Sequence, residues 1–221
     1  MSETYLSYTA FKKYVTCPQS YYQEYIQRKR PKIEDQRNVL NGNALHNLLE
    51  EYINTNVNDV SWLNSNIKRV WKETLDKCHT VNWKHDNDAR ELLEKAVRWS
   101  NTLSELIENS KLDITNCQPE LKADTVVKVG DYSIKMGARL DVVHKNKYND
   151  YMFLDLKASE NRAVMEFDQL VWYSIVLGEY LKDSNQPKYG GYILPGFNEI
   201  KMYEIPISAK TKLLARLEEV I

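Results

Sequence analysis

The chain has 221 residues, of which 43% are hydrophobic and 28% charged, and its formal net charge is −1 at pH 7. This composition is typical of a soluble globular protein with one sizeable core, and it excludes long disordered tails. The balanced charge excludes a protein whose whole surface binds polyanions, but it allows a local phosphate-binding groove. No stretch approaches the roughly 18 apolar residues of a membrane-spanning helix, and the N-terminus lacks a signal-peptide core, so we expect a cytoplasmic protein.

The three cysteines, Cys17, Cys78 and Cys117, are odd in number and widely spaced. That spacing predicts neither a disulfide framework nor a four-cysteine metal site. We expect reduced thiols.

Helices are expected over the first half of the chain. Residues 9–26 predict two short helices broken at Cys17-Pro18, because proline cannot continue a helix that has already begun. The basic run Arg28, Lys29, Arg30 and Lys32 predicts a loop, either a solvated surface or a phosphate contact. A third helix is expected to begin near Asn43, with His46 semi-buried at the edge of its apolar stripe, and residues 61–111 predict two or three further helical elements.

Strands are expected from Pro119 onward. Residues 121–129, 132–144 and 151–157 predict a three-stranded meander with turns at Gly130-Asp131 and residues 146–150. An amphipathic helix over residues 163–181, strands over 189–194 and 201–207, and a closing helix from Ala209 complete the pattern. We therefore predict an α/β fold in one domain, residues 1–221, with the helical region of about 61–111 inserted before the core strands.

Two of the predicted strands carry a candidate catalytic group. Side chains alternate between the faces of a strand, so Arg139 and Asp141 share one face, and Asp155 and Lys157 share another. If the strands pair as a hairpin, the two carboxylates can lie side by side with the lysine one step along. Close carboxylates resist joint ionisation unless a cation compensates, and such hard oxygen ligands favour Mg²⁺ or Mn²⁺. This pattern predicts metal-dependent phosphodiester hydrolysis, with Lys157 orienting water or stabilising developing charge.

Other interpretations of the same residues stay open at this point. An Asp-x-Lys pair at a strand end is usually a solvated ion pair. A helix histidine such as His46 is often hydrogen-bonded at the edge of a core. Gln169 and Tyr173 share one face of a helix, where they could serve core packing and satisfy buried backbone groups.

Several short motifs occur together in a fixed order along nearly the whole chain. They are Leu6-Ser-Tyr-Thr-Ala-Phe11, Cys17-Pro18, Tyr21-Tyr22, Gly42-Asn-Ala-Leu-His46, Gly137-Ala-Arg-Leu-Asp141, Asp155-Leu-Lys157 after thirteen further residues, and Gln169-Leu-Val-Trp-Tyr173. In this order they resemble the RecB-like branch of the PD-(D/E)XK nuclease superfamily, which includes CRISPR-adaptation exonucleases. The resemblance implies a restriction-endonuclease-like core, in which helices flank a central mixed β-sheet.

The resemblance also implies roles for individual residues. It makes His46, Asp141, Asp155 and the backbone carbonyl of Leu156 metal ligands, Lys157 the catalytic lysine, and Gln169 and Tyr173 substrate-positioning residues. Glu120 matches the acidic residue that opens the first core strand in several relatives.

Two departures from the family pattern bear on the site. Relatives with an iron-sulfur cluster hold it with one N-terminal cysteine and three near the C-terminus. Cys17 occupies the first position, but no cysteine follows Cys117, so no cluster is expected. The third acid of the motif is Asp155 rather than the more frequent glutamate, which shortens the ligand arm by one methylene.

We therefore expect a Mg²⁺- or Mn²⁺-dependent deoxyribonuclease that acts as an exonuclease. One alternative is a catalytically silent module that binds DNA ends, although such a module has no need for a repulsive carboxylate pair. A second is a nuclease subunit that acts with a separate helicase or recombination protein, because the chain has no phosphate-cradling Gly-x-x-x-x-Gly-Lys-Ser/Thr element. A third is site-specific cleavage of the restriction type. The sequence predicts no oligomeric state and no strand polarity.

Overall fold

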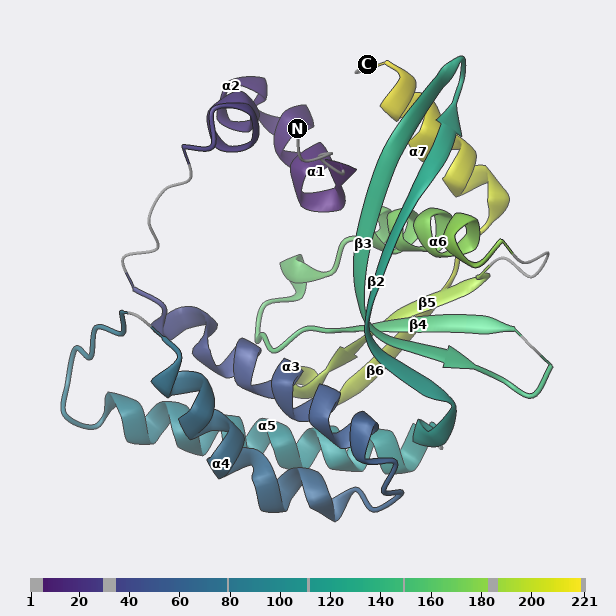
Figure 1. Ribbon diagram of the computed structural model, residues 1–221. Helices are drawn as coiled ribbons and strands as arrows, with labels where there is room; N and C mark the ends of the chain where they lie inside the picture. The colour runs from purple at the N-terminus through teal and green to yellow at the C-terminus, as the bar shows by residue number, and fades with distance from the viewer. Residues whose placement is uncertain are drawn as a thin grey trace.

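A computed structural model describes residues 6–29, 35–78, 80–110, 112–148, 150–182 and 187–219 (Figure 1). The α-helices are α1 (Tyr8–Thr16), α2 (Pro18–Tyr21), α3 (Arg37–Thr55), α4 (Ser61–Asp76), α5 (Asp88–Ser110), α6 (Phe167–Leu181) and α7 (Ile207–Glu218). The strands are β1 (Leu6–Ser7), β2 (Cys117–Val129), β3 (Tyr132–Lys145), β4 (Tyr151–Leu156), β5 (Tyr189–Leu194) and β6 (Glu199–Glu204). A π-helical turn covers Tyr22–Ile26, and 3₁₀ turns cover Ile114–Asn116, Arg162–Val164 and Pro195–Phe197.

The six strands form one mixed sheet. The long hairpin of β2 and β3 is antiparallel, and β3 continues into antiparallel pairing with β4. The short β1 runs parallel to β3 beyond the end of β4, β5 runs parallel to β4, and β6 closes the other side antiparallel to β5. The predicted α/β fold with a central mixed sheet flanked by helices is confirmed.

Two apolar clusters bury the two sides of the sheet. Helices α3, α4 and α5 pack against Val142, Leu154 and Leu156 in one cluster. Helices α6 and α7 and the N-terminal Phe11 pack with Leu140 and Phe153 in the other. Figure 1 shows α3, α4 and α5 as a bundle on one side of the strands, with α6 and α7 on the other side. Burial of both faces explains why the core strands are largely apolar.

Helix α3 begins at Arg37, and the predicted start near Asn43 was wrong. Its first turns are polar in sequence, so local pattern does not identify them. Arg37 forms an ion pair with Asp88 at the start of α5, with the Arg37 Nη1 to Asp88 Oδ2 distance at 2.8 Å. Leu40 is fully buried in the helical bundle. Tertiary contacts therefore extend the helix beyond the segment that periodicity predicts.

Helix α6 also differs from its prediction. It begins at Phe167 rather than at residue 163, because a 3₁₀ turn occupies Arg162–Val164. Its buried residues form a continuous run, Leu170 to Gly178, so the helix is not amphipathic. A helix enclosed between a sheet and other helices is apolar on all sides.

The predicted alternation along the second core strand, β3, is broken near Asp141. The alternation that places Arg139 and Asp141 on one face also predicts one shared face for Leu140 and Val142. Instead, Leu140 packs in the cluster of α6 and Val142 in the cluster of α3, α4 and α5. On the neighbouring strand, Glu120 has a φ of 48°, in the left-handed region that non-glycine residues rarely adopt. A distortion of this kind, near the start of β2, changes which side of the sheet each side chain faces.

Among the other predictions, the short N-terminal helices, the meander with its turn at Gly130, and the strand over 189–194 are confirmed. The last strand and helix are displaced by two or three residues, to Glu199–Glu204 and Ile207–Glu218, and the two-residue strand β1 was missed. Arg30, Pro31 and Lys32 of the basic run and Lys111 at the end of the helical region lie outside the described residues. In the part of the chain that is described, no helix is long and apolar enough to cross a membrane.

Candidate active site

Three carboxylates lie in one row across β2, β3 and β4. The register pairs Pro119 with Val142 and Leu121 with Leu140, so Glu120 lies opposite Asp141. On the other side of β3, continuing the antiparallel register past Val142 and Leu154 brings Asp155 opposite the same Asp141. The predicted side-by-side arrangement of the two aspartates follows directly from this hairpin.

Helix α3 adds a histidine to this row. His46 Nδ1 lies 3.2 Å from Asp141 Oδ1 and 4.0 Å from Glu120 Oε1. The ligand atoms of His46, Glu120 and Asp141 all lie within 4.8 Å of one another, a spacing at which one metal ion could be held. Asp141 Oδ2 accepts a hydrogen bond from the backbone N–H of Leu156 at 2.7 Å, which brings the Leu156 backbone to the site.

Asp155 is the most deeply buried acid of the row, with 4% of its surface exposed. Its Oδ2 lies 2.7 Å from Lys157 Nζ and has no hydrogen bond of good geometry within the described residues. Its Oδ1 lies 3.5 Å from Gln169 Nε2, which also donates to the hydroxyl of Tyr173 at 2.7 Å. Gln169 therefore lies between the buried carboxylate and the hydroxyl of Tyr173.

Burial and neighbouring charges shift the pKa values of three groups at the site. Burial is the largest cause of the rise in the pKa of Asp155 to about 6; Lys157 opposes this rise, and the negative charge of Asp141 adds to it. Burial also raises the pKa of Glu120, with the Arg139 ion pair opposing. Burial alone would lower the pKa of His46, but the hydrogen bond and charge of Asp141 outweigh it and raise that pKa. A bound cation would relieve this repulsion, so the donor set fits a hard divalent metal ion.

The row forms one wall of a pocket of about 580 Å³. Seven of its lining residues are predicted site residues: His46, Glu120, Asp141, Asp155, Lys157, Gln169 and Tyr173. Seven more were not predicted as site residues: Gln36, Asn43, Asn47, Thr74, Lys77, Cys78 and Arg139. Two of these carried a sequence signal: Arg139 shares a strand face with Asp141, and Asn43 lies in the Gly42–His46 motif. The others lie in α3, in α4 or next to these helices, and the strand pattern cannot place them.

Tyr192 is a further residue that sequence reasoning missed. It lies opposite Asp155 in the register of β4 and β5 and is fully buried. Lys157 Nζ lies 5.8 Å from the centre of its ring, within reach of a cation–π interaction. Its hydroxyl donates to the Glu166 carbonyl at 2.8 Å and accepts from the Glu166 N–H at 3.1 Å. These two hydrogen bonds hold the ring of Tyr192 in place beside Lys157.

Comparison with known proteins agrees with this fold. The family model of the PD-(D/E)XK nuclease superfamily matches residues 5–215. No curated protein gives a significant match. The crystal structure of a candidate exonuclease from Eubacterium rectale is similar with a TM-score of 0.52 and 10% sequence identity, over 97% of this chain and 77% of that one. That identity establishes a shared fold alone. With the family match, it confirms the restriction-endonuclease-like core.

A second similar structure is that of SSO0001. It is 24% identical over 59% of this chain and has a TM-score of 0.30. The chain covers 65% of SSO0001, which is less than two thirds of its length.

Proposed function

Because the chain belongs to the PD-(D/E)XK nuclease superfamily, we propose that it is a divalent-metal-dependent deoxyribonuclease that acts as an exonuclease. The observation that carries this proposal is the carboxylate row, in which Asp141 lies between Glu120 and Asp155 with Lys157 beside it. Without a metal ion, repulsion among these carboxylates would cost free energy, and the row would repel a phosphate backbone. With a divalent cation bound, the same row would attract the phosphate backbone.

His46, Glu120 and Asp141 would hold the ion, with Asp155 and the carbonyl of Leu156 as further ligands. Oxygen donors favour Mg²⁺ or Mn²⁺, and the imidazole nitrogen of His46 makes Mn²⁺ the better ligand match. The bound ion would supply Lewis-acid polarisation of the scissile phosphate and a water of lowered pKa. Arg139 holds Glu120 from the exposed side, through the ion pair between its Nε and Glu120 Oε2.

Lys157 is proposed as the catalytic lysine. The carboxylate of Asp155 and the ring of Tyr192 fix its ammonium group at the edge of the pocket. From there it can orient the attacking water or stabilise the negative charge that develops on the phosphate. Gln169 and Tyr173 are proposed to hold Asp155 in its orientation and to position the substrate from the same side.

The exonuclease assignment is the finer part of the proposal. It is supported by the fold shared with the Eubacterium rectale protein and by the ordered motifs of the RecB-like branch. We also propose that residues 1–221 form one domain, with α4 and α5 as the helical insertion.

The proposal is tested with end-labelled linear DNA and covalently closed circular DNA in Mg²⁺, Mn²⁺ or EDTA. Wild-type protein should degrade linear DNA only, with either metal and not in EDTA. Asp155→Ala should be inactive, whereas Asp131→Ala, which removes an exposed carboxylate at the β2–β3 turn, should be fully active. Cutting of circles would make the enzyme an endonuclease. Binding of linear DNA without cleavage under every condition would support the silent end-binding module or a requirement for a helicase.

A further inference from the structure

The two walls of the active-site pocket differ in charge. The wall formed by the sheet carries all three of its carboxylates, Glu120, Asp141 and Asp155. The facing wall comes from α3, α4 and the residues next to them. Among the lining residues that the structure describes, it presents amide, hydroxyl and thiol groups, together with His46 and Lys77, and no acid. A polyanionic strand entering the pocket would therefore meet favourable partners on the helical wall.

Lys77 differs from the other cationic side chains that line the pocket. Arg139 is paired with Glu120, Lys157 with Asp155, and His46 lies against Asp141. Lys77 is exposed, and no carboxylate of the described residues lies within ion-pair distance of it. Its charge is available to a ligand.

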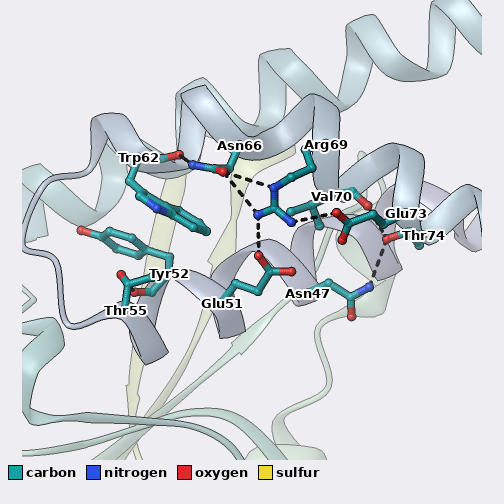
Figure 2. A network of polar contacts seen from close by, with 10 residues as sticks. All are labelled: Asn47, Glu51, Tyr52, Thr55, Trp62, Asn66, Arg69, Val70, Glu73 and Thr74. Atoms are coloured by element: carbon teal, nitrogen blue, oxygen red, sulfur yellow. Dashed lines mark hydrogen bonds and ion pairs between the residues drawn. The ribbon is translucent and has the colours of Figure 1, made fainter.

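Acidic groups also lie on the outer side of Lys77. A groove of about 150 Å³ is lined by Lys77 together with Glu50, Glu51 and Glu73. Figure 2 shows that Arg69 engages two of these glutamates, at 2.6 Å from Glu51 and 3.0 Å from Glu73. Arg69 carries one positive charge against these three carboxylates, so it offsets only part of their negative charge. Lys77 forms an ion pair with none of them among the described residues, and it also lines the active-site pocket.

Helix α4, which Lys77 follows, is held against α3 by the contacts drawn in Figure 2. Arg69 on α4 reaches across to Glu51 on α3, and Asn47 Nδ2 on α3 donates to the Thr74 hydroxyl at 3.1 Å. Lys77 follows Thr74 by three residues, about one helical turn. Its position relative to α3 is therefore fixed, while the side chain keeps the reach of its four-carbon stem.

We propose that Lys77, with the amides of Asn43 and Asn47, binds a backbone phosphate next to the scissile one. The inserted helices then form the second wall of a nucleic-acid cleft. This inference rests on the proposed nuclease function. A lysine recognises phosphate as a point charge, and amide N–H groups add hydrogen bonds without reading base identity. Lys77 is thus a positioning residue that increases affinity for the strand and leaves the chemical step to the carboxylate row and Lys157.

The test compares Lys77→Ala and Lys77→Arg with Lys68→Ala. Lys68 is the matched control, because it is an exposed lysine of α4, the helix that Lys77 follows, and it does not line the pocket. Each variant is combined with Lys157→Met, so that binding of a fluorescein-labelled single-stranded oligonucleotide is measured by anisotropy without turnover. Lys77→Ala should weaken binding about 5- to 10-fold at low salt and reduce the slope of log K against log salt by about 0.7. Lys77→Arg should restore both, and Lys68→Ala should change neither.

Kinetics in the otherwise wild-type background provide a second measurement. Lys77→Ala should raise KM several-fold with kcat within about 2-fold of wild type, because the lost contact is made equally in the ground and transition states. An unchanged salt slope and KM would overturn this inference and leave the proposed nuclease untouched. Equal losses in Lys77→Ala and Lys68→Ala would also overturn it. The wild-type protein could fail to cleave DNA under every condition while Lys77→Ala still weakened binding. That result would overturn the nuclease proposal alone.

Discussion

Asp141 is tied to the neighbouring strand by its own side chain, because its Oδ2 accepts the backbone N–H of Leu156 at 2.7 Å. This contact lies just beyond the last paired residues of β3 and β4, Val142 and Leu154. The side chain therefore takes over the role of a backbone acceptor where the two strands separate. One consequence is that the carboxylate is already oriented, with Oδ1 directed toward His46.

Substitutions of Asp141 should separate its structural role from its role as a metal ligand. Asp141→Asn keeps an oxygen that can accept from Leu156, so we expect nearly wild-type thermal stability but loss of metal binding. Asp141→Ala leaves a buried N–H unpaired and should also cost about 1–3 kcal/mol of folding free energy. Denaturant titration and calorimetry with Mn²⁺ measure the two effects. Equal stability of both variants would contradict the structural role.

Lys157→Met should reduce kcat at least about 100-fold, because it removes a positioned charge from the reacting phosphate while keeping the side-chain length. Lys157→Arg should not restore full activity, since the planar guanidinium does not reproduce a compact ammonium beside Asp155. Single-turnover cleavage of labelled DNA measures this effect. A loss confined to KM would place Lys157 in substrate binding instead.

In the metal-free protein, the contribution of Asp155 to stability should fall as pH rises. Its pKa is raised to about 6 in the folded state, so the stabilising contribution of the neutral acid is complete below its usual pKa near 4 and is lost as pH rises through 6. The raised pKa values of Glu120 and His46 act in the same direction. Between pH 4 and 7.5 the Asp155 contribution is on the order of 2–3 kcal/mol.

Urea unfolding in EDTA across this pH range, with wild type and Asp155→Asn side by side, tests the assignment. The stability of the wild type relative to Asp155→Asn, which cannot ionise at this position, should decrease as pH rises. Saturating Mn²⁺ should remove this decrease above pH 6, because the ion binds only the ionised carboxylates. Parallel profiles of the two metal-free proteins would contradict the prediction.

His46→Ala should weaken Mn²⁺ binding about 10-fold or more, and the effect should be smaller for Mg²⁺, which prefers oxygen ligands. The raised pKa of His46 implies that protons compete with the metal at mildly acidic pH, since only neutral imidazole is a ligand. Affinity for Mn²⁺ should therefore fall faster with decreasing pH in the wild type than in His46→Ala. Isothermal titration calorimetry at several pH values measures both slopes. Identical slopes would exclude His46 as a ligand.

Asn41 should be the most sensitive polar residue of the helical bundle. It is buried, accepts from Trp71 Nε1 at 2.8 Å and donates to the Leu92 carbonyl at 2.9 Å, which links α3, α4 and α5. Asn41→Ala should cost about 2 kcal/mol because the buried indole N–H loses its acceptor. Arg69→Ala, which removes the exposed α3–α4 network of Figure 2, should cost less than about 1 kcal/mol. Equal costs in chemical denaturation would contradict this ranking.

The sequence by itself determined the strands of the core and the residues that face one another on them. Spacing of two places Asp155 and Lys157 on one face of a strand, and a short turn fixes the hairpin that brings Asp155 opposite Asp141. These are local properties of extended backbone and tight turns, so periodicity and turn residues suffice to predict them.

Only the tertiary structure decided the rest of the pocket. Glu120 joins His46 and Asp141 through a left-handed backbone distortion that no residue pattern announces. Lys77 and Asn47 reach the pocket because α4 packs on α3, and Tyr192 reaches Lys157 because β5 lies beside β4. Such contacts join residues far apart in the chain, and they depend on how buried apolar surfaces pack rather than on any local preference.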